Sequence, residues 1–187
     1  MAWNIALLIC CSVVLVRSNP TDVDCTRRQD FNTVKDCCAY PTFRFEQFKK
    51  ECGKYMPVGA PRISPCLYEC IFNTTNSMVD GAIDPDNLQL MLEKLFGSNP
   101  DFIDAYFNGI MSCTETVQDM ISNRRPRSKN KTSQCSPTAL FYGVCAQKYV
   151  FNHCPSSSWS STELCNLARL QNMNCTSARS SRGTSSQ

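Results

Sequence analysis

The chain has few of the residues on which enzyme active sites usually depend. Its one histidine, His153, stands near a predicted helix end without a nucleophile-elbow motif, so a Ser/His/Asp triad is not favoured. Its seven glycines form no phosphate-binding loop. A Cys-x-x-Cys pair, which is typical of zinc and redox sites, is absent from the sequence. These absences predict a protein that is not an enzyme and that holds no cofactor or metal.

Long apolar runs are also scarce. Residues 5–16 form a run that is long enough for the core of a signal peptide but too short to span a bilayer. Ser18 supplies a small residue at a suitable cleavage point. We therefore expect a signal peptide over residues 1–18 and a secreted, extracellular mature protein without membrane insertion.

Neither sign of charge is in large excess, because 19 Lys and Arg stand against 16 Asp and Glu. The Pro/Ser/Asn-rich stretch over residues 122–134 predicts an exposed basic loop. A nucleic-acid interface would interleave aromatic residues with such charges, and this loop has none, so we expect no nucleic-acid binding. Asn130 is a glycosylation candidate because it opens an Asn-Lys-Thr sequon in the loop. The clustered basic residues are Arg124, Arg125, Arg127, Lys129 and Lys131.

Cysteine, in contrast, is abundant. The chain has 14 cysteines, and removal of Cys10 and Cys11 with the signal peptide leaves twelve. An even number of cysteines in an oxidising compartment predicts full pairing, which gives six disulfides here. The cysteines expected to be bonded are Cys25, Cys37, Cys38, Cys52, Cys66, Cys70, Cys113, Cys135, Cys145, Cys154, Cys165 and Cys175.

Helix signals dominate the rest of the mature chain. Four polar residues each precede a proline, a combination that suits an N-cap followed by the first helical residue. Apolar residues then follow helical rather than alternating spacing. The sequence predicts a compact, all-α, disulfide-laced bundle of six to eight helices, as a single domain over residues 19–177 with a disordered tail over 178–187. The four predicted N-caps are Ser64, Asp84, Asn99 and Ser136.

Two pairs of cysteines have a spacing that limits their pairing. Cys66 and Cys70 are four residues apart in one predicted helix. Their Cβ atoms should therefore lie about 5–6 Å apart, farther than the roughly 3.5–4.5 Å of a disulfide. Each must bond a different segment. Cys145 and Cys154 are separated by more than two helical turns, so they need separate partners as well.

A larger cysteine pattern covers most of the mature chain, from Cys37 to Cys165. It consists of Cys37-Cys38, Cys66-x-x-x-Cys70, Cys113, and Cys145 followed after eight residues by Cys154. This pattern resembles the six-cysteine signature of insect odorant-binding proteins. Further features are similar to the Plus-C subclass of that family, namely Cys135, Pro155 directly after Cys154, and Cys165.

The resemblance implies a secreted, noncatalytic helical carrier that serves olfaction. Such a carrier binds small hydrophobic molecules, odorants or pheromone-like compounds, in an internal apolar cavity and delivers them in the fluid around chemosensory neurons. The implied partners are a small hydrophobic ligand and an odorant receptor. The resemblance also implies three disulfides and leaves the other six cysteines unassigned. The three are Cys37 or Cys38 with Cys70, Cys66 with Cys145, and Cys113 with Cys154.

Residues on the apolar helix faces are the candidates for the lining of such a cavity. Flexible methionines and flat aromatic rings suit varied apolar guests, although each of these residues, taken without the resemblance, is more typical of an ordinary packed core. Tyr106 could in addition offer its hydroxyl to a ligand oxygen. The candidates are Phe48, Met78, Leu88, Met91, Leu92, Leu95, Phe102, Tyr106, Phe107, Phe141 and Val144.

A second hypothesis fits the same composition. A secreted interaction protein, such as an inhibitor or defence factor, would have the same disulfides but a solid core, and the basic loop would make its contact. Uptake of an apolar probe separates the two hypotheses. Either protein could be a monomer or a homodimer, since amphipathic surface helices can bury a shared face.

Overall fold

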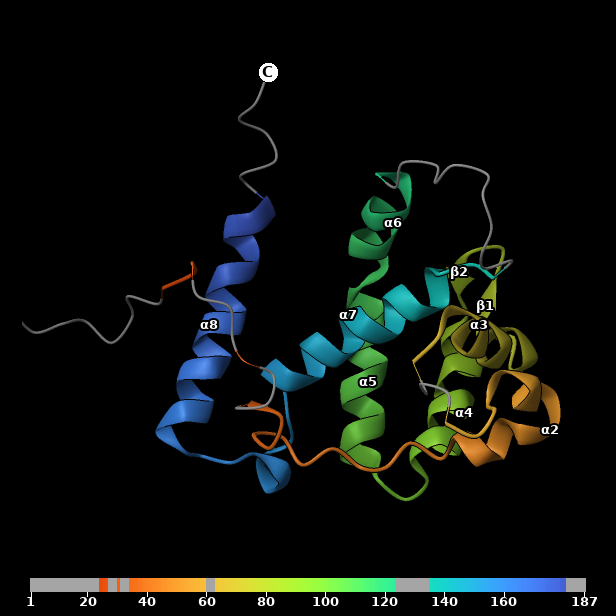
Figure 1. The fold of residues 1–187 in the computed structure, drawn as a ribbon, viewed down its shortest axis with the longest axis horizontal. Helices are drawn as coiled ribbons and strands as arrows, with labels where there is room; N and C mark the ends of the chain where they lie inside the picture. The colour runs from red at the N-terminus through yellow and green to blue at the C-terminus, as the bar shows by residue number, and fades with distance from the viewer. Residues whose placement is uncertain (1–23, 27–29, 31–33, 60–62, 124–134, 181–187) are drawn as a thin grey trace, which may run out of the picture.

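The computed structural model describes residues 24–26, 30, 34–59, 63–123 and 135–180 (Figure 1). The predicted signal peptide, Asn130 and nearly all of the predicted basic loop lie outside these residues, as does the end of the predicted tail. The last helix extends to Ser180, so it includes the first three residues of that tail. No helix in the described ranges is long and apolar enough to cross a membrane.

The described residues form an all-α structure, which confirms the predicted fold class. Seven α-helices lie within them, in agreement with the expected six to eight. Three 3₁₀ helices and a two-stranded sheet complete the described elements. In chain order the elements are η1 (Phe45–Phe48), α2 (Lys49–Cys52), η2 (Gly53–Tyr55), α3 (Pro65–Thr74), β1 (Met78–Val79), β2 (Ala82–Ile83), α4 (Pro85–Phe96), α5 (Pro100–Ser112), α6 (Thr114–Ser122), α7 (Thr138–Asn152), η3 (Ser156–Ser158) and α8 (Glu163–Ser180).

Side-chain caps explain where two of the helices begin. At the start of α3, Ser64 Oγ accepts a hydrogen bond from the backbone N–H of Leu67 at 3.3 Å. At the start of α4, Asp84 Oδ1 accepts from the N–H of Asn87 at 2.9 Å. Each cap is followed by proline in the first turn, where a missing N–H leaves no helical hydrogen bond unmade. Both predicted helix starts are therefore confirmed.

Two other helices begin differently from the prediction. Asn99 precedes α5, but its Nδ2 donates to the Phe96 carbonyl at 2.6 Å and so closes α4 rather than capping the new helix. Before α7, Pro137 rather than Ser136 stands directly before the first helical residue, and Ser136 Oγ accepts a hydrogen bond from the N–H of Thr138 at 3.3 Å.

The strands β1 and β2 form a short hairpin that helical spacing did not predict. They pair antiparallel around Asp80 and Gly81, whose φ values of 52° and 81° are both positive. A two-residue turn of this kind favours Asp-Gly, so this dipeptide is the local signal for the hairpin. Met78 was expected on a helix face, and that prediction is wrong because Met78 lies in β1.

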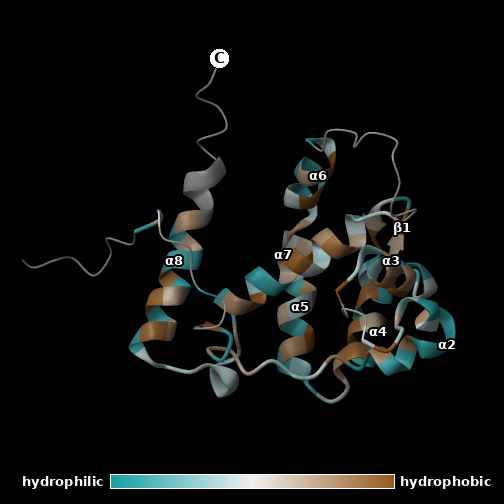
Figure 2. Ribbon diagram, in the orientation of Figure 1, coloured by the Kyte–Doolittle hydropathy of each residue, from teal (hydrophilic) through white to brown (hydrophobic). Residues whose placement is uncertain are grey.

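The helices α5 and α7 cross at the centre of the bundle, and α7 also contacts α3, α6 and α8 (Figure 1). Their close approach depends on Gly109 of α5. A Cβ at this position would lie 3.2 Å from the Cα of Ala146 on α7, so a side chain would push the two helices apart. Apolar side chains gather where α3, α4, α5 and α7 meet, whereas α8 lies to one side (Figure 2).

Six disulfides join the twelve cysteines of the described chain, as the cysteine count predicted. Two of them hold α8 to the N-terminal segment, and a third joins that segment to the residues after α7. The other three link α2 to α3, α3 to the segment before α7, and α7 to the junction of α5 and α6. The pairs are Cys25–Cys175, Cys37–Cys165, Cys38–Cys154, Cys52–Cys70, Cys66–Cys135 and Cys113–Cys145.

The pairings implied by the resemblance are wrong for Cys66 and Cys113. Cys66 bonds Cys135 rather than Cys145, because the first turn of α3 faces the segment that leads into α7. Cys145 lies about two turns farther along α7, where it meets the junction of α5 and α6 and bonds Cys113. The prediction that Cys145 and Cys154 have separate partners is confirmed, since Cys145 bonds Cys113 and Cys154 bonds Cys38.

The implied partner of Cys70 is also wrong. Cys70 bonds Cys52, which lies at the end of α2, and α2 packs directly against α3. Cys38 is far from this contact, because it pairs with Trp159 in an isolated β-bridge and bonds Cys154. Cys66 and Cys70 nevertheless bond different segments, as their spacing required.

Candidate ligand-binding pockets

The structure buries most of the residues that were expected to line a cavity. Seven of the eleven candidates are buried in the core, three are partly buried against it, and Val144 is 56% exposed. The buried seven are Phe48, Leu88, Met91, Leu92, Leu95, Phe102 and Tyr106, and the partly buried three are Met78, Phe107 and Phe141. Burial of this extent is typical of side chains packed against one another.

Four of the candidates surround a small space between α3, α4, α5 and α7, which we call the inner space. Its volume is about 40 Å³. A single water needs roughly 10–15 Å³ of such volume, whereas ligand pockets usually measure roughly 300–1,000 Å³. The inner space is therefore too small for an odorant-sized molecule unless its walls move. It is lined by Phe43, Tyr68, Phe72, Met91, Leu92, Leu95, Phe96, Tyr106, Ile110, Gly143 and Gln147.

Tyr106 is the most unusual residue of the inner space. Its ring stacks on Phe96 with centroids 4.7 Å apart and meets the edge of Phe43 at 5.7 Å. The residue is 4% exposed, and its buried hydroxyl has no hydrogen-bond partner. Most buried tyrosine hydroxyls are hydrogen-bonded, because an unpaired buried donor costs free energy.

Burial also affects the acidity of the tyrosines in this region. It raises the pKa of Tyr106 well above its usual range, and the nearby hydroxyls of Tyr40 and Tyr68 raise it further. Burial raises the pKa of Tyr40 to about 12 and also raises the pKa of Tyr68. The Tyr106 hydroxyl is thus neutral at physiological pH and can both donate and accept a hydrogen bond.

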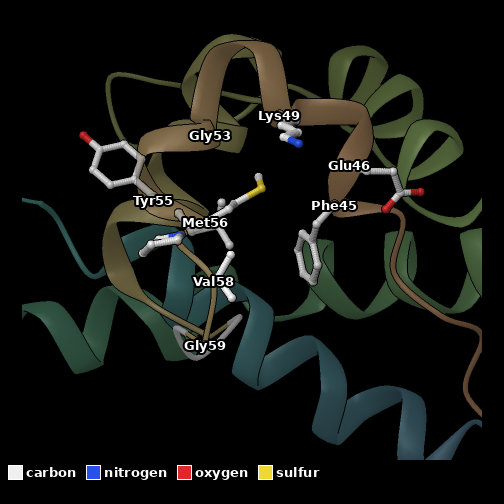
Figure 3. Close-up of a pocket in the computed structure, with 10 residues that line it drawn as sticks. Phe45, Glu46, Lys49, Gly53, Tyr55, Met56, Val58 and Gly59 are labelled. Carbon is white, nitrogen blue, oxygen red and sulfur yellow. The ribbon is translucent and has the colours of Figure 1, made fainter.

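A much larger pocket, which we call the outer groove, opens on the side of the bundle formed by η1, α2 and η2. Its volume is about 410 Å³, within the range of ligand pockets. Phe45 faces Met56 and Val58 across the opening, while Glu46 and Tyr55 extend away from it (Figure 3). The groove is lined by Phe45, Glu46, Lys49, Gly53, Tyr55, Met56, Pro57, Val58, Gly59 and Leu67.

Three local features fix the outer groove to the bundle. Cys52 at the end of α2 bonds Cys70 of α3, so the wall formed by α2 cannot move far from α3. Leu67 of α3 is 1% exposed and lies at the floor of the groove. The Met56 N–H donates to the Gly53 carbonyl at 3.0 Å, which turns the chain back across the opening.

A third pocket, which we call the α7–α8 groove, has a volume of about 400 Å³. It includes Val144, the exposed ligand candidate. Its lining includes two lysines, a glutamine and an asparagine beside its apolar residues. The lining residues are Val34, Lys35, Tyr40, Ile63, Val144, Gln147, Lys148, Phe151 and Asn172.

None of the residues that line the outer groove was among the predicted ligand contacts. Phe48 was predicted to lie on an apolar face of an α-helix. Residues 45–55 instead form a 3₁₀ helix, one turn of α-helix and a second 3₁₀ helix. This change of twist buries Phe48 in the core and leaves Phe45 facing the groove. The missed signal is the apolar run Tyr55-Met56-Pro57-Val58, which follows a glycine and contains a proline.

The described residues offer no obvious catalytic or metal-binding cluster. His153 stacks on Tyr149 with ring centroids 3.9 Å apart, and its Nδ1 lies 2.9 Å from the Tyr149 carbonyl oxygen. Because a carbonyl only accepts, Nδ1 donates this hydrogen bond. Within the described ranges, no group of three or more His, Cys, Asp or Glu side chains could hold a metal ion.

Comparison of the sequence with protein-family models and with curated proteins finds no match.

Proposed function

We propose that the chain is a secreted, noncatalytic carrier of small hydrophobic molecules of the odorant or pheromone class. The observation that carries this proposal is the outer groove, an apolar pocket of about 410 Å³ that is tied to the bundle by a disulfide. Ligand pockets of this kind combine apolar walls with a few polar groups at the edge. Lys49 supplies such a group here. Six disulfides are typical of proteins that work outside the cell.

The disulfide order also supports the proposed relationship to Plus-C odorant-binding proteins. The resemblance implied a set of six cysteines, which in chain order is Cys37 or Cys38, Cys66, Cys70, Cys113, Cys145 and Cys154. Within that set, the implied pairing joins the first cysteine to the third, the second to the fifth and the fourth to the sixth. The structure has the same order of pairing on a different set of six cysteines. That set, in chain order, is Cys52, Cys66, Cys70, Cys113, Cys135 and Cys145.

A second candidate function is a secreted interaction protein with a solid core. The observation that favours it is the inner space, because a volume of about 40 Å³ among the expected cavity residues is closer to a packed core than to a ligand cavity. The two candidates differ in one measurable property, which is the uptake of apolar molecules by the folded, oxidised protein.

Competitive displacement of N-phenyl-1-naphthylamine from the delipidated protein tests the proposal. Wild type should take up the probe saturably, and apolar competitors should displace it. The Gly53→Trp variant should weaken uptake at least about tenfold, which corresponds to about 1.4 kcal/mol, because the indole fills the groove. Gly53 has φ −58° and a Cβ there would lie 3.6 Å from Lys49 Cγ, so the backbone accepts a side chain.

The matched control is Leu90→Trp, which adds the same indole to the exposed face of α4, away from the described pockets. Its uptake should equal that of wild type. If delipidated wild type binds no probe of several chemotypes, the carrier proposal is wrong and the interaction protein becomes the better candidate.

A further inference from the structure

The buried hydroxyl of Tyr106 has no hydrogen-bond partner among the described protein groups, and a buried donor without a partner costs free energy. A phenylalanine would fill the same volume without burying an unsatisfied donor, and the ring already packs between Phe43 and Phe96. The hydroxyl gains a partner only when a group with hydrogen-bonding capacity comes into the inner space. Its presence at a site that is 4% exposed therefore points to an oxygen or nitrogen atom of a bound molecule.

The lining of the inner space restricts what that molecule can be. None of the eleven lining residues carries a formal charge, so a carboxylate or an ammonium group would be buried without a counter-ion. Seven of the eleven residues have apolar side chains, among them Phe43 and Ile110. The space thus suits a neutral, largely apolar molecule with one polar atom.

The inner space and the outer groove are neighbours, separated by a thin aromatic wall. Phe43 lines the inner space and Phe45 lines the outer groove, and their rings stack with centroids 5.5 Å apart and planes at 13°. On the opposite side, Leu67 of α3 lines the groove while the next residue, Tyr68, lines the inner space. Phe45 stands at the edge of the groove opening in Figure 3. Rotation of these two partly buried rings would join the two spaces.

We propose, on the basis of the carrier function, that a ligand lies with its apolar chain in the outer groove and its single oxygen past the Phe43–Phe45 pair, hydrogen-bonded to Tyr106. The preferred ligands are accordingly neutral, medium-chain molecules with one accepting oxygen, such as ketones and aldehydes, rather than hydrocarbons, acids or amines. The hydroxyl of Tyr106 donates to that oxygen.

The test compares two ligands that differ in the oxygen alone, nonan-2-one and 2-methylnon-1-ene. Wild type should bind the ketone about five to ten times more tightly than the alkene, the ratio expected of one buried hydrogen bond. The Tyr106→Phe variant should bring this ratio to about one and leave the alkene affinity within about twofold of wild type. The Tyr149→Phe control removes the same atom from a tyrosine that lines none of the described pockets, and should keep the wild-type ratio.

A second measurement detects the hydrogen bond between the ketone oxygen and Tyr106 directly. The carbonyl stretching band of bound nonan-2-one should lie at lower frequency in wild type than in Tyr106→Phe, because a phenol donor weakens the C=O bond. An unchanged ketone-to-alkene ratio together with an unshifted band in Tyr106→Phe would overturn the assignment while the carrier function stands. Failure of wild type to bind either molecule would instead overturn the carrier function, and this inference with it.

Discussion

The inner space and the outer groove are both lined mainly by apolar residues, yet their sizes differ about tenfold, at about 40 and 410 Å³. The inner space is enclosed by four helices of ten to fifteen residues, whose apolar stripes meet and interdigitate. The outer groove is enclosed by elements of three or four residues and by the irregular segment 56–59. Elements this short have no continuous apolar stripe.

A ligand-sized pocket forms in this chain where the helices are short and irregular. Long amphipathic helices fill the volume between them because their side chains repeat in register along each axis. The segment that includes η1 and η2 changes its twist every few residues, so its apolar side chains cannot all turn inward. The remaining apolar surface, which includes Phe45 and Met56, forms the groove.

The largest expected effect on stability is that of a truncated side chain in the inner space. Leu92 is 1% exposed and lines that space, so Leu92→Ala should lower the free energy of unfolding by about 3 kcal/mol. Val58→Ala in the outer groove should change it by less than about 0.5 kcal/mol, since Val58 is fully exposed. Urea unfolding followed by far-UV circular dichroism measures both values. Equal losses for the two variants would mean that the groove is as closely packed as the core.

Loss of the disulfide between α2 and α3 should affect both stability and uptake. Replacing Cys52 and Cys70 with alanine opens a link between residues 18 apart in the sequence, which costs about 3 kcal/mol in the loop-entropy model. Because this link anchors the wall of the outer groove, probe uptake should also weaken. Replacing Cys25 and Cys175 with alanine should leave uptake unchanged, because that disulfide holds only α8. Parallel thermal scans and probe titrations distinguish these outcomes, and equal uptake in the two double variants contradicts the role given to Cys52–Cys70.

The local features of the fold were largely predictable from sequence. Ser64-Pro65 and Asp84-Pro85 mark the starts of α3 and α4, because capping depends on neighbouring residues alone. Gly97 ends α4 with φ 61°, a conformation that glycine adopts readily. The all-α class and the number of disulfides follow from similar short-range or compositional signals. Each of these features can be judged without knowing where distant segments lie.

The disulfide partners and the pocket could not be predicted in this way. Cys66 could bond any cysteine that the fold brings near, and the choice of Cys135 depends on how α3 meets the start of α7. Apolar periodicity identified the core residues Met91 and Leu92 but could not separate a packed interior from a cavity, since both need the same side chains. The outer groove escaped prediction because Phe45 belongs to a 3₁₀ helix without helical periodicity.

The buried tyrosines predict how stability depends on pH. The pKa of Tyr106 is raised in the folded protein, so above pH 10 the unfolded chain loses this proton while the folded chain keeps it. The unfolded state then binds fewer protons, and the free energy of unfolding must fall as pH rises. Each buried tyrosine that stays protonated contributes about 1.4 kcal/mol per pH unit in that range. Urea unfolding at pH 9 and pH 11 measures the loss, and the share of the tyrosinate absorbance that belongs to Tyr40, Tyr68 and Tyr106 should appear only as the protein unfolds. Complete tyrosinate formation in the folded protein near pH 10 would contradict this account.

The smallest expected effect is the most direct test of the inner space in the free protein. Tyr106→Phe removes a buried hydroxyl that has no partner, so at neutral pH it should raise the free energy of unfolding by about 1 kcal/mol rather than lower it. The aromatic contacts of Tyr106 with Phe43 and Phe96 stay in place, because the ring is kept. With saturating nonan-2-one, wild type should instead have the higher free energy of unfolding, since the ketone stabilises wild type more than the variant. A lower stability of Tyr106→Phe without ligand would mean that the hydroxyl already has a partner in the free protein. The inner space would then resemble the rest of the core, and its difference from the outer groove would be one of size alone.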